Sequence, residues 1–231
     1  MSDTAKSGSI DIMHIRFCGT HGDVAMKALL INGSPRGEKC TYTALTEVAS
    51  ALKDEGIEFE IVNVDKAVRG CTGCAACRKK GQCVIDDEVN AIGSRLDEFD
   101  AIVLGSPVYY AGPSAEVQAF CDRLFYSHAS KMWGKVGASV VSCRRGGASA
   151  AFDRLNKYFT ICNMPIASSQ YWNQVHGNTP EEVRKDLEGM QTMRTLGKNI
   201  AWMLKCFEAG RKAGIERPVQ EPFVRTNFIR D

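Results

Sequence analysis

The segment KALLINGSPR, residues 27–36, joins a short apolar run to a polar loop that contains glycine and proline. A run of four to eight apolar residues that stops at a turn signal is typical of a strand buried on both faces of a parallel sheet. We therefore expect a strand at 27–31. The polar loop would then lie at the carboxyl end of that strand, where open α/β sheets bind ligands.

Helix and strand patterns alternate along the chain after this segment. Residues 42–54 carry apolar side chains at helical spacing, and 58–64 (EFEIVNV) alternate as a strand does. The same patterns predict strands at 101–105, 136–143 and 164–168, and helices at 114–126, at 147–160 and over Val89, Ile92 and Leu96. This alternation predicts an α/β protein with a doubly wound, five-stranded parallel sheet and helices on both faces.

A strong signal for a helix N-terminus lies near the end of the chain, at residues 179–182 (TPEE). Threonine at the cap, proline at the first helical position and glutamate three after the cap are the expected signals. An apolar stripe follows at intervals of three or four, made of Val183, Leu187, Met190, Met193, Leu196, Ile200, Met203 and Phe207. We interpret the stripe as core packing. Its length and its methionines also suit contact with a second subunit.

Composition limits the function classes. The chain has 231 residues, 44% of them hydrophobic, which suits one domain with a sizeable core. Its 29 basic and 27 acidic residues form no long runs, so we expect no nucleic-acid binding. No apolar run approaches the roughly 20 residues that span a bilayer, and 1–25 lack the apolar core of a secretion signal. We expect a cytoplasmic protein that does not bind membranes.

The same features predict how the chain is organised. Residues 1–25 show no periodicity, so we expect an N-terminal extension there. Residues 26–215 would form the domain, with a cysteine-rich insert at 69–85. Residues 216–231 would be a C-terminal tail.

Four of the ten cysteines are grouped with the spacing C-x2-C-x2-C-x5-C. They are Cys71, Cys74, Cys77 and Cys83. Such spacing lets thiolates converge on a [4Fe-4S] cluster, as the ligands of bacterial ferredoxins do. Zinc sites usually pair two C-x2-C motifs a dozen or more residues apart, so the spacing favours iron-sulfur over zinc. Reduced thiols without a metal remain the alternative.

The loop after the first predicted strand has the groups that bind a phosphate. It supplies hydroxyls, a guanidinium and flexible backbone, and it leads into a helix N-terminus. Hydrogen bonds to a charged group contribute about 1.5–3 kcal/mol each, against about 0.3–1 kcal/mol from the helix dipole. The loop amides and the side chains of Ser34, Arg36 and Thr41 would therefore contribute more to the binding free energy of a phosphate than the helix dipole. The loop matches neither the P-loop nor G-x-G-x-x-G, and an ordinary turn is the alternative.

Three motifs fall at carboxyl ends of predicted strands: residues 32–36 with Thr41, residues 105–110 (GSPVYY) and residues 143–147 (CRRGG). Together they resemble the NADPH-dependent FMN reductases of the flavodoxin-like superfamily. The cysteine segment is most similar to the iron-sulfur flavoprotein branch of that family. The resemblance covers roughly residues 27–215 and implies a flavodoxin-like fold that binds FMN without a covalent bond.

The resemblance also implies roles for individual residues. The first loop would hold the FMN phosphate through Ser34, Arg36, Cys40 and Thr41. The second would line the isoalloxazine ring with Pro107, Val108, Tyr109 and Tyr110. The third would face the pyrimidine edge with Cys143, Arg144, Arg145 and Gly146. Cys40 departs from the family pattern, since relatives often carry asparagine or serine there. A pair of core tyrosines is the alternative for the second loop.

The activity implied by the resemblance is hydride transfer from NAD(P)H to FMN, then delivery of electrons to a small acceptor such as a flavin, quinone, nitro or azo compound. The cofactor would carry the chemistry, so no catalytic acid or base is assigned. One alternative is an electron carrier in which an iron-sulfur cluster serves a ferredoxin-like partner. Another is a redox-sensing module whose cysteines respond to oxidation. The family tends to complete its flavin pocket at subunit contacts, which implies a homodimer or homotetramer.

Overall fold

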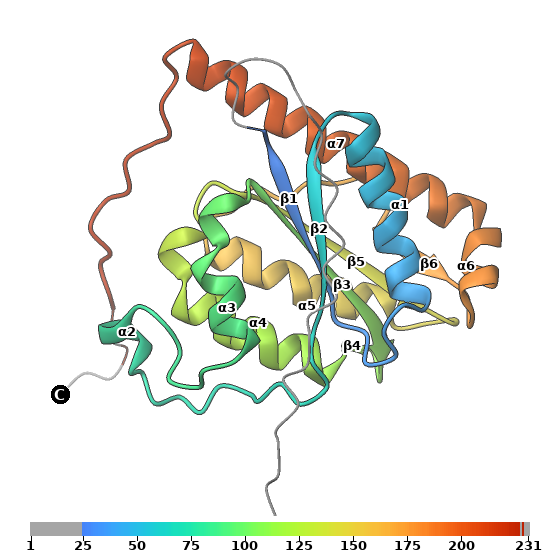
Figure 1. Cartoon of the computed structure of the whole chain (residues 1–231), viewed down its shortest axis with the longest axis horizontal. Helices are drawn as coiled ribbons and strands as arrows, with labels where there is room; N and C mark the ends of the chain where they lie inside the picture. The colour runs from blue at the N-terminus through green and yellow to red at the C-terminus, as the bar shows by residue number, and fades with distance from the viewer. Residues whose placement is uncertain (1–24, 227, 229–231) are drawn as a thin grey trace, which may run out of the picture.

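The computed structural model describes residues 25–226 and residue 228, and its centre is a twisted parallel sheet (Figure 1). The strands lie in the order β2-β1-β3-β5-β6. Their bounds are Lys27–Asn32 for β1, Glu58–Asn63 for β2, Ala101–Tyr109 for β3, Val136–Cys143 for β5 and Gln174–His176 for β6. All four neighbouring pairs run parallel. This order is the flavodoxin-like one, which confirms the predicted fold class.

The prediction of the fifth strand was wrong in position. Within 164–168, Ile166 makes only one isolated bridge, to Gly137, and the fifth parallel strand is β6. Pro165 has no N–H to donate, so this segment cannot extend the hydrogen-bond ladder of β5. A sixth short strand, β4 (Gly112–Pro113), pairs antiparallel with the end of β3.

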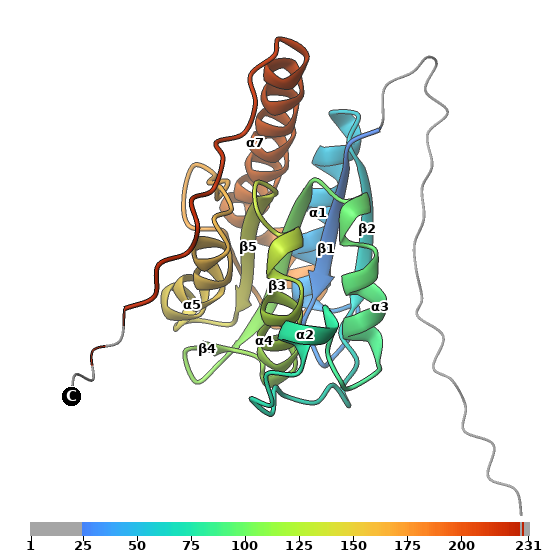
Figure 2. The same ribbon diagram turned by 90° about the vertical axis from the view of Figure 1, so that its left-hand side faces the viewer.

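Helices cover both faces of the sheet, as predicted (Figure 2). One layer holds α1 (Cys40–Asp54), α6 (Pro180–Lys185) and α7 (Leu187–Lys212), and the other holds α3 (Glu88–Ser94), α4 (Ala115–Ser127) and α5 (Ala148–Ile161). The remaining helical turns are α2 (Cys77–Lys80), η1 (Leu96–Glu98) and η2 (Ala129–Lys131). Each layer buries its own apolar cluster against the sheet.

The last predicted helix is interrupted at Asp186, which separates α6 from α7. The Asp186 carboxylate accepts hydrogen bonds from the backbone N–H of Gly189 at 2.9 Å and of His176 at 2.7 Å. This side chain therefore caps α7 and ties it to β6. The middle of the apolar stripe is core, as predicted, but Leu187 is 77% exposed and Phe207 47% exposed.

The predicted N-terminal extension lies outside the described residues except for Ala25. Residues 216–226 are exposed and have no helix or strand. Among the described residues, no helix is both long and apolar enough to cross a membrane.

Candidate functional site

The three loops predicted to bind FMN meet at one edge of the sheet. They follow β1, β3 and β5, which are neighbours, so their carboxyl ends lie side by side. Gly33 donates its N–H to the carbonyl of Gly105 at 2.8 Å. The hydroxyls of Thr41 and Ser142 are hydrogen-bonded at 2.8 Å. Residues distant in the sequence are thus joined at this edge by direct hydrogen bonds.

Asn32 shapes the first loop from inside. Its side chain is buried, and its amide nitrogen donates to Gly37 O at 3.1 Å and to Asn63 Oδ1 at 2.7 Å. Its Oδ1 accepts from the N–H of Ser34 at 3.3 Å. The Ser34 hydroxyl in turn accepts from the N–H of Arg36 at 3.3 Å. Asn32 belongs to the predicted motif at 32–36, but sequence reasoning gave it no role of its own, although a polar residue at the end of a buried strand is a usable signal.

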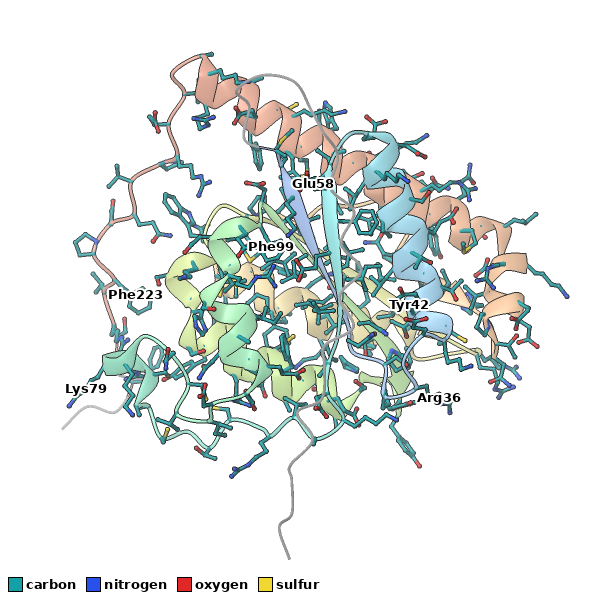
Figure 3. All side chains as sticks on the ribbon, viewed as in Figure 1. Arg36, Tyr42, Glu58, Lys79, Phe99 and Phe223 are labelled. Atoms are coloured by element: carbon teal, nitrogen blue, oxygen red, sulfur yellow. The ribbon has the colours of Figure 1, made fainter. Side chains whose placement is uncertain are left out.

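The N-terminus of α1 faces this loop. The helix begins at Cys40 with no side-chain cap from the described residues and with no acid in its first turn. Arg36 is exposed beside it (Figure 3). Ser34 and Thr41 are buried. Burial raises the pKa of the Cys40 thiol, although Arg36 opposes that shift. A neutral thiol at a positive helix end does not repel an anion, so this corner suits a phosphate.

The second loop is a tight turn with a strained backbone. Tyr110 and Ala111 have φ values of 49° and 61°, between the paired residues Tyr109 and Gly112. Two consecutive left-handed residues at such a turn usually need asparagine and glycine, and each costs of order 1–3 kcal/mol in other residues. Tyr110 is fully exposed. Tyr109 is 38% exposed, so the alternative of two core tyrosines is wrong for both residues.

The third loop packs against the second. Gly147 has a φ of 87°, and a Cβ there would lie 2.9 Å from Ala111 Cα and 3.1 Å from Val108 Cγ1. Cys143 is buried at the end of β5, and burial raises the pKa of its thiol. The predicted site residues Arg144, Arg145 and Gly146 are exposed. Glycine at 147 lets the two loops approach closely, so they form one surface.

The cysteine insert leaves the carboxyl end of β2 and runs along the same end of the sheet to α3 (Figure 1). All four predicted ligands line one small hollow, together with Arg123 and Tyr126 of α4. Cys71 and Cys74 are exposed, and Cys77 and Cys83 are half-buried. Backbone N–H groups and the Thr72 hydroxyl lower the pKa of Cys74.

These thiols do not form a ready-made centre for a single ion. Among the described residues, no three His, Cys, Asp or Glu side chains are placed to hold a metal ion together. Zinc requires four ligands at about 2.0–2.3 Å from one point, so the arrangement does not suit zinc. Four cysteine thiols are the donor set of a [4Fe-4S] cluster, in which each cysteine binds a different iron, but the described residues show no assembled cluster site. Sequence reasoning missed Arg123, which also lines this hollow.

Glu88 makes stability near the insert depend on pH. Its carboxylate accepts the N–H of Asp65 at 2.9 Å, and burial raises its pKa from 4.5 to about 7. A raised folded-state pKa means that the neutral acid stabilises the fold below pH 4.5, and that this contribution is lost as the pH rises through about 7. We expect Glu88→Gln to raise the melting temperature at pH 8 and to change it little at pH 4. Thermal unfolding at both pH values measures this, and an equal change at both would contradict it.

The strand order and the three joined loops define a flavodoxin-like α/β protein with its ligand edge at the carboxyl ends of β1, β3 and β5. The chain belongs to the NADPH-dependent FMN reductase family, whose model matches residues 26–179, and to its iron-sulfur flavoprotein branch.

Two relatives support this assignment, and a solved structure shares the fold. An iron-sulfur flavoprotein of Methanocaldococcus jannaschii is 34% identical over 191 residues, which are 78% of this chain and 98% of that protein. One from Methanosarcina thermophila is 31% identical, over 80% of this chain and 99% of that protein. The flavodoxin-like, WrbA-like protein of Agrobacterium tumefaciens has a TM-score of 0.57 at 17% identity, over 79% of this chain and 99% of that one. The last similarity concerns the fold alone.

Proposed function

We propose that this protein is an FMN-dependent NAD(P)H oxidoreductase that passes electrons to a small acceptor such as a flavin, quinone, nitro or azo compound. The observation that carries the proposal is the meeting of the loops after β1, β3 and β5 at one edge. Family membership supports a flavin-dependent oxidoreductase. Residues 26–215 would form the FMN-binding unit.

The residues at this edge fit FMN. Ser34, Arg36, Cys40 and Thr41 would hold the phosphate, since they surround an uncapped helix N-terminus that has no acid in its first turn. Pro107, Val108, Tyr109 and Tyr110 would contact the ring, and Cys143, Arg144, Arg145 and Gly146 would lie at its pyrimidine edge. When bound, FMN supplies hydride acceptance and electron delivery. The chain itself would bind FMN, orient it and shield it from water, and no side chain is proposed as an acid or base.

Anaerobic mixing of the FMN-loaded protein with NADPH or NADH tests this function. The proposal predicts that the visible flavin absorbance is lost and that a quinone then restores it. Full retention of that absorbance with both nucleotides would overturn the reductase proposal. The free flavin without protein, mixed in the same way, is the control.

Arg36 provides a direct test of the phosphate site. Arg36→Ala should weaken FMN binding by about 10-fold to 100-fold, because one charged hydrogen bond contributes about 1.5–3 kcal/mol. Riboflavin, which lacks the phosphate, should bind both proteins equally. Lys157→Ala removes one positive charge from the exposed face of α5 and serves as the matched control. Fluorescence titration of the wild type and both variants with the two ligands measures all six affinities, and an equal loss for both ligands in Arg36→Ala would contradict the assignment.

A second candidate function is that of an electron carrier. Two observations favour it: all four cysteines line one hollow, and the relatives are named iron-sulfur flavoproteins. Cys71, Cys74, Cys77 and Cys83 would hold a [4Fe-4S] cluster, which supplies single-electron storage, and a ferredoxin-like protein would be the partner. Iron and sulfide assays after anaerobic purification decide between the two. About four irons per chain supports the carrier, and none overturns it.

We also propose that the protein is a homodimer or homotetramer. The support is an exposed aromatic set around the site edge and α7, namely Tyr110, Trp172 and Trp202. Large aromatic side chains are enriched at protein interfaces. If sedimentation equilibrium gives the mass of a single chain, this proposal is overturned.

A further inference from the structure

Arg123 is a buried cation at the centre of the cysteine insert. It lies on α4, is 1% exposed, and uses every donor of its guanidinium group. Nε donates to the sulfur of Cys83 at 3.2 Å. Nη1 donates to Arg69 O at 3.2 Å and Nη2 to Ile85 O at 2.8 Å. Both Nη atoms also bind the Asp87 carboxylate, at 2.6 and 2.7 Å.

We propose that Arg123 is the positioning residue of the four-cysteine site, which fixes the shape of the insert and holds a positive charge against the sulfur of Cys83. This inference rests on the electron-carrier proposal. Nothing in the sequence motif assigns Arg123, since it lies on a helix that contributes no cysteine ligand to the set. Its contacts explain both parts of the role.

The first part is mechanical. Arg69 precedes the first cysteine of the insert, whereas Ile85 and Asp87 follow the last one, so one guanidinium group joins both ends of the insert. A flexible loop closed in this way loses conformational freedom before any metal binds. Arginine suits the task because its planar fork reaches several acceptors at fixed angles.

A second contact that holds the cysteine insert comes from the same face of α4. Tyr126, three residues after Arg123, accepts hydrogen bonds from Nε and Nη2 of Arg78 at 3.0 and 2.7 Å. Arg78 belongs to α2, which begins at Cys77 and ends before Cys83. Helix α4 therefore holds the insert at its ends and at its middle.

Cys83 is the most firmly held of the four cysteines. Its backbone N–H donates to Asn90 Oδ1 at 3.0 Å, and its carbonyl accepts from Asn90 Nδ2 at 2.9 Å. With Arg123 on its sulfur, both its backbone and its side chain are fixed. Ligands held by their surroundings in this way need less reorganisation when the metal binds.

The second part of the role is electrostatic. Hydrogen bonds to ligand sulfurs and nearby charges set the reduction potential of iron-sulfur centres. Reduction adds negative charge, so a fixed cation at Cys83 stabilises the reduced state and raises the potential. Removing that cation should lower the potential, whereas lysine should retain part of the effect.

The test compares the wild type with Arg123→Gln and Arg123→Lys. Arg154→Gln is the matched control, because Arg154 is partly exposed and its partners, Asp122 and Tyr158, lie outside residues 69–87. Three quantities are measured on the full chain: hydrogen exchange of peptides from residues 69–87 in the iron-free protein, iron uptake from ferrous iron and sulfide, and the midpoint potential. Retained FMN checks that each variant is folded.

We expect exchange in 69–87 to be at least about 10-fold faster in Arg123→Gln and unchanged in Arg154→Gln, as expected when about 1.4 kcal/mol of local stability is lost. The potential should fall in Arg123→Gln and fall less in Arg123→Lys. If Arg123→Gln takes up no iron while Arg154→Gln does, the positioning role is supported. If Arg123→Gln has the same exchange rate in 69–87 and the same midpoint potential as the wild type, the inference is overturned. If the wild type takes up no iron, the electron-carrier proposal is overturned. Hydrogen exchange in the iron-free proteins then tests only whether Arg123 fixes the shape of the insert.

Discussion

The Gly33→Ala protein should be isolated without FMN and should unfold at a lower denaturant concentration than the wild type. A Cβ at residue 33 would lie 2.3 Å from Val117 Cβ and 3.0 Å from Gly105 O. Neither neighbour can move easily, because Val117 is a buried β-branched residue of α4 and Gly105 belongs to the central strand β3. Overpacking of this kind costs about 1–3 kcal/mol.

The effect on FMN follows from the position of Gly33. Its N–H and carbonyl join the first loop to Gly105 and to the Ser114 hydroxyl, at 2.8 and 2.6 Å. A shift at this point moves the phosphate loop relative to the β3 loop. Gly70→Ala is the matched control, since a Cβ there meets no atom within 4 Å. Denaturant unfolding and the flavin content after purification measure the outcome, and normal FMN content in Gly33→Ala would contradict the assignment of this edge.

The second large effect is expected at Asn32. Asn32→Asp removes the amide that donates to Gly37 O and to Asn63 Oδ1, and it places a carboxylate against both acceptors. Each buried polar group left without a partner costs about 1–3 kcal/mol. The new negative charge would also repel a phosphate. We expect FMN binding to weaken by more than about 100-fold and the midpoint of unfolding to fall.

A matched substitution on the partner side separates geometry from charge. Asn63→Asp adds the same charge but keeps the Oδ1 acceptor that Asn32 needs. It should therefore retain most of the FMN affinity. Titration of both proteins with FMN gives the comparison. Equal losses in Asn32→Asp and Asn63→Asp would show that charge alone acts, and would contradict the scaffold role of Asn32.

Local sequence patterns predicted most of the fold, because apolar runs and apolar helical stripes indicate buried segments whatever their tertiary partners are. The strand at 136–143 was predicted with the bounds it has. The fifth strand was not, since β6 has only three residues and is fixed by pairing with β5, which no local pattern records. The interruption at Asp186 was missed for a similar reason, because it depends on a hydrogen bond from the N–H of His176 in β6 to the Asp186 carboxylate.

The site was predicted in part. The residues of the three loops could be found because they follow strands that were themselves predictable. The scaffold role of Asn32 and the whole of Arg123 were missed, because their importance lies in contacts with residues distant in the sequence, such as Asn63 and Cys83. A buried arginine inside an amphipathic helix has no sequence signal that separates it from an exposed one. Its role appears only once the helix is packed.

The central claim, a flavin phosphate site at the carboxyl edge of the sheet, is tested most directly by titrating the flavin-free protein with FMN and with riboflavin. The two ligands differ only in the phosphate. Two charged hydrogen bonds of about 1.5–3 kcal/mol each predict that FMN binds at least about 100-fold more tightly. Equal affinity for the two, or no binding of either, would contradict the account.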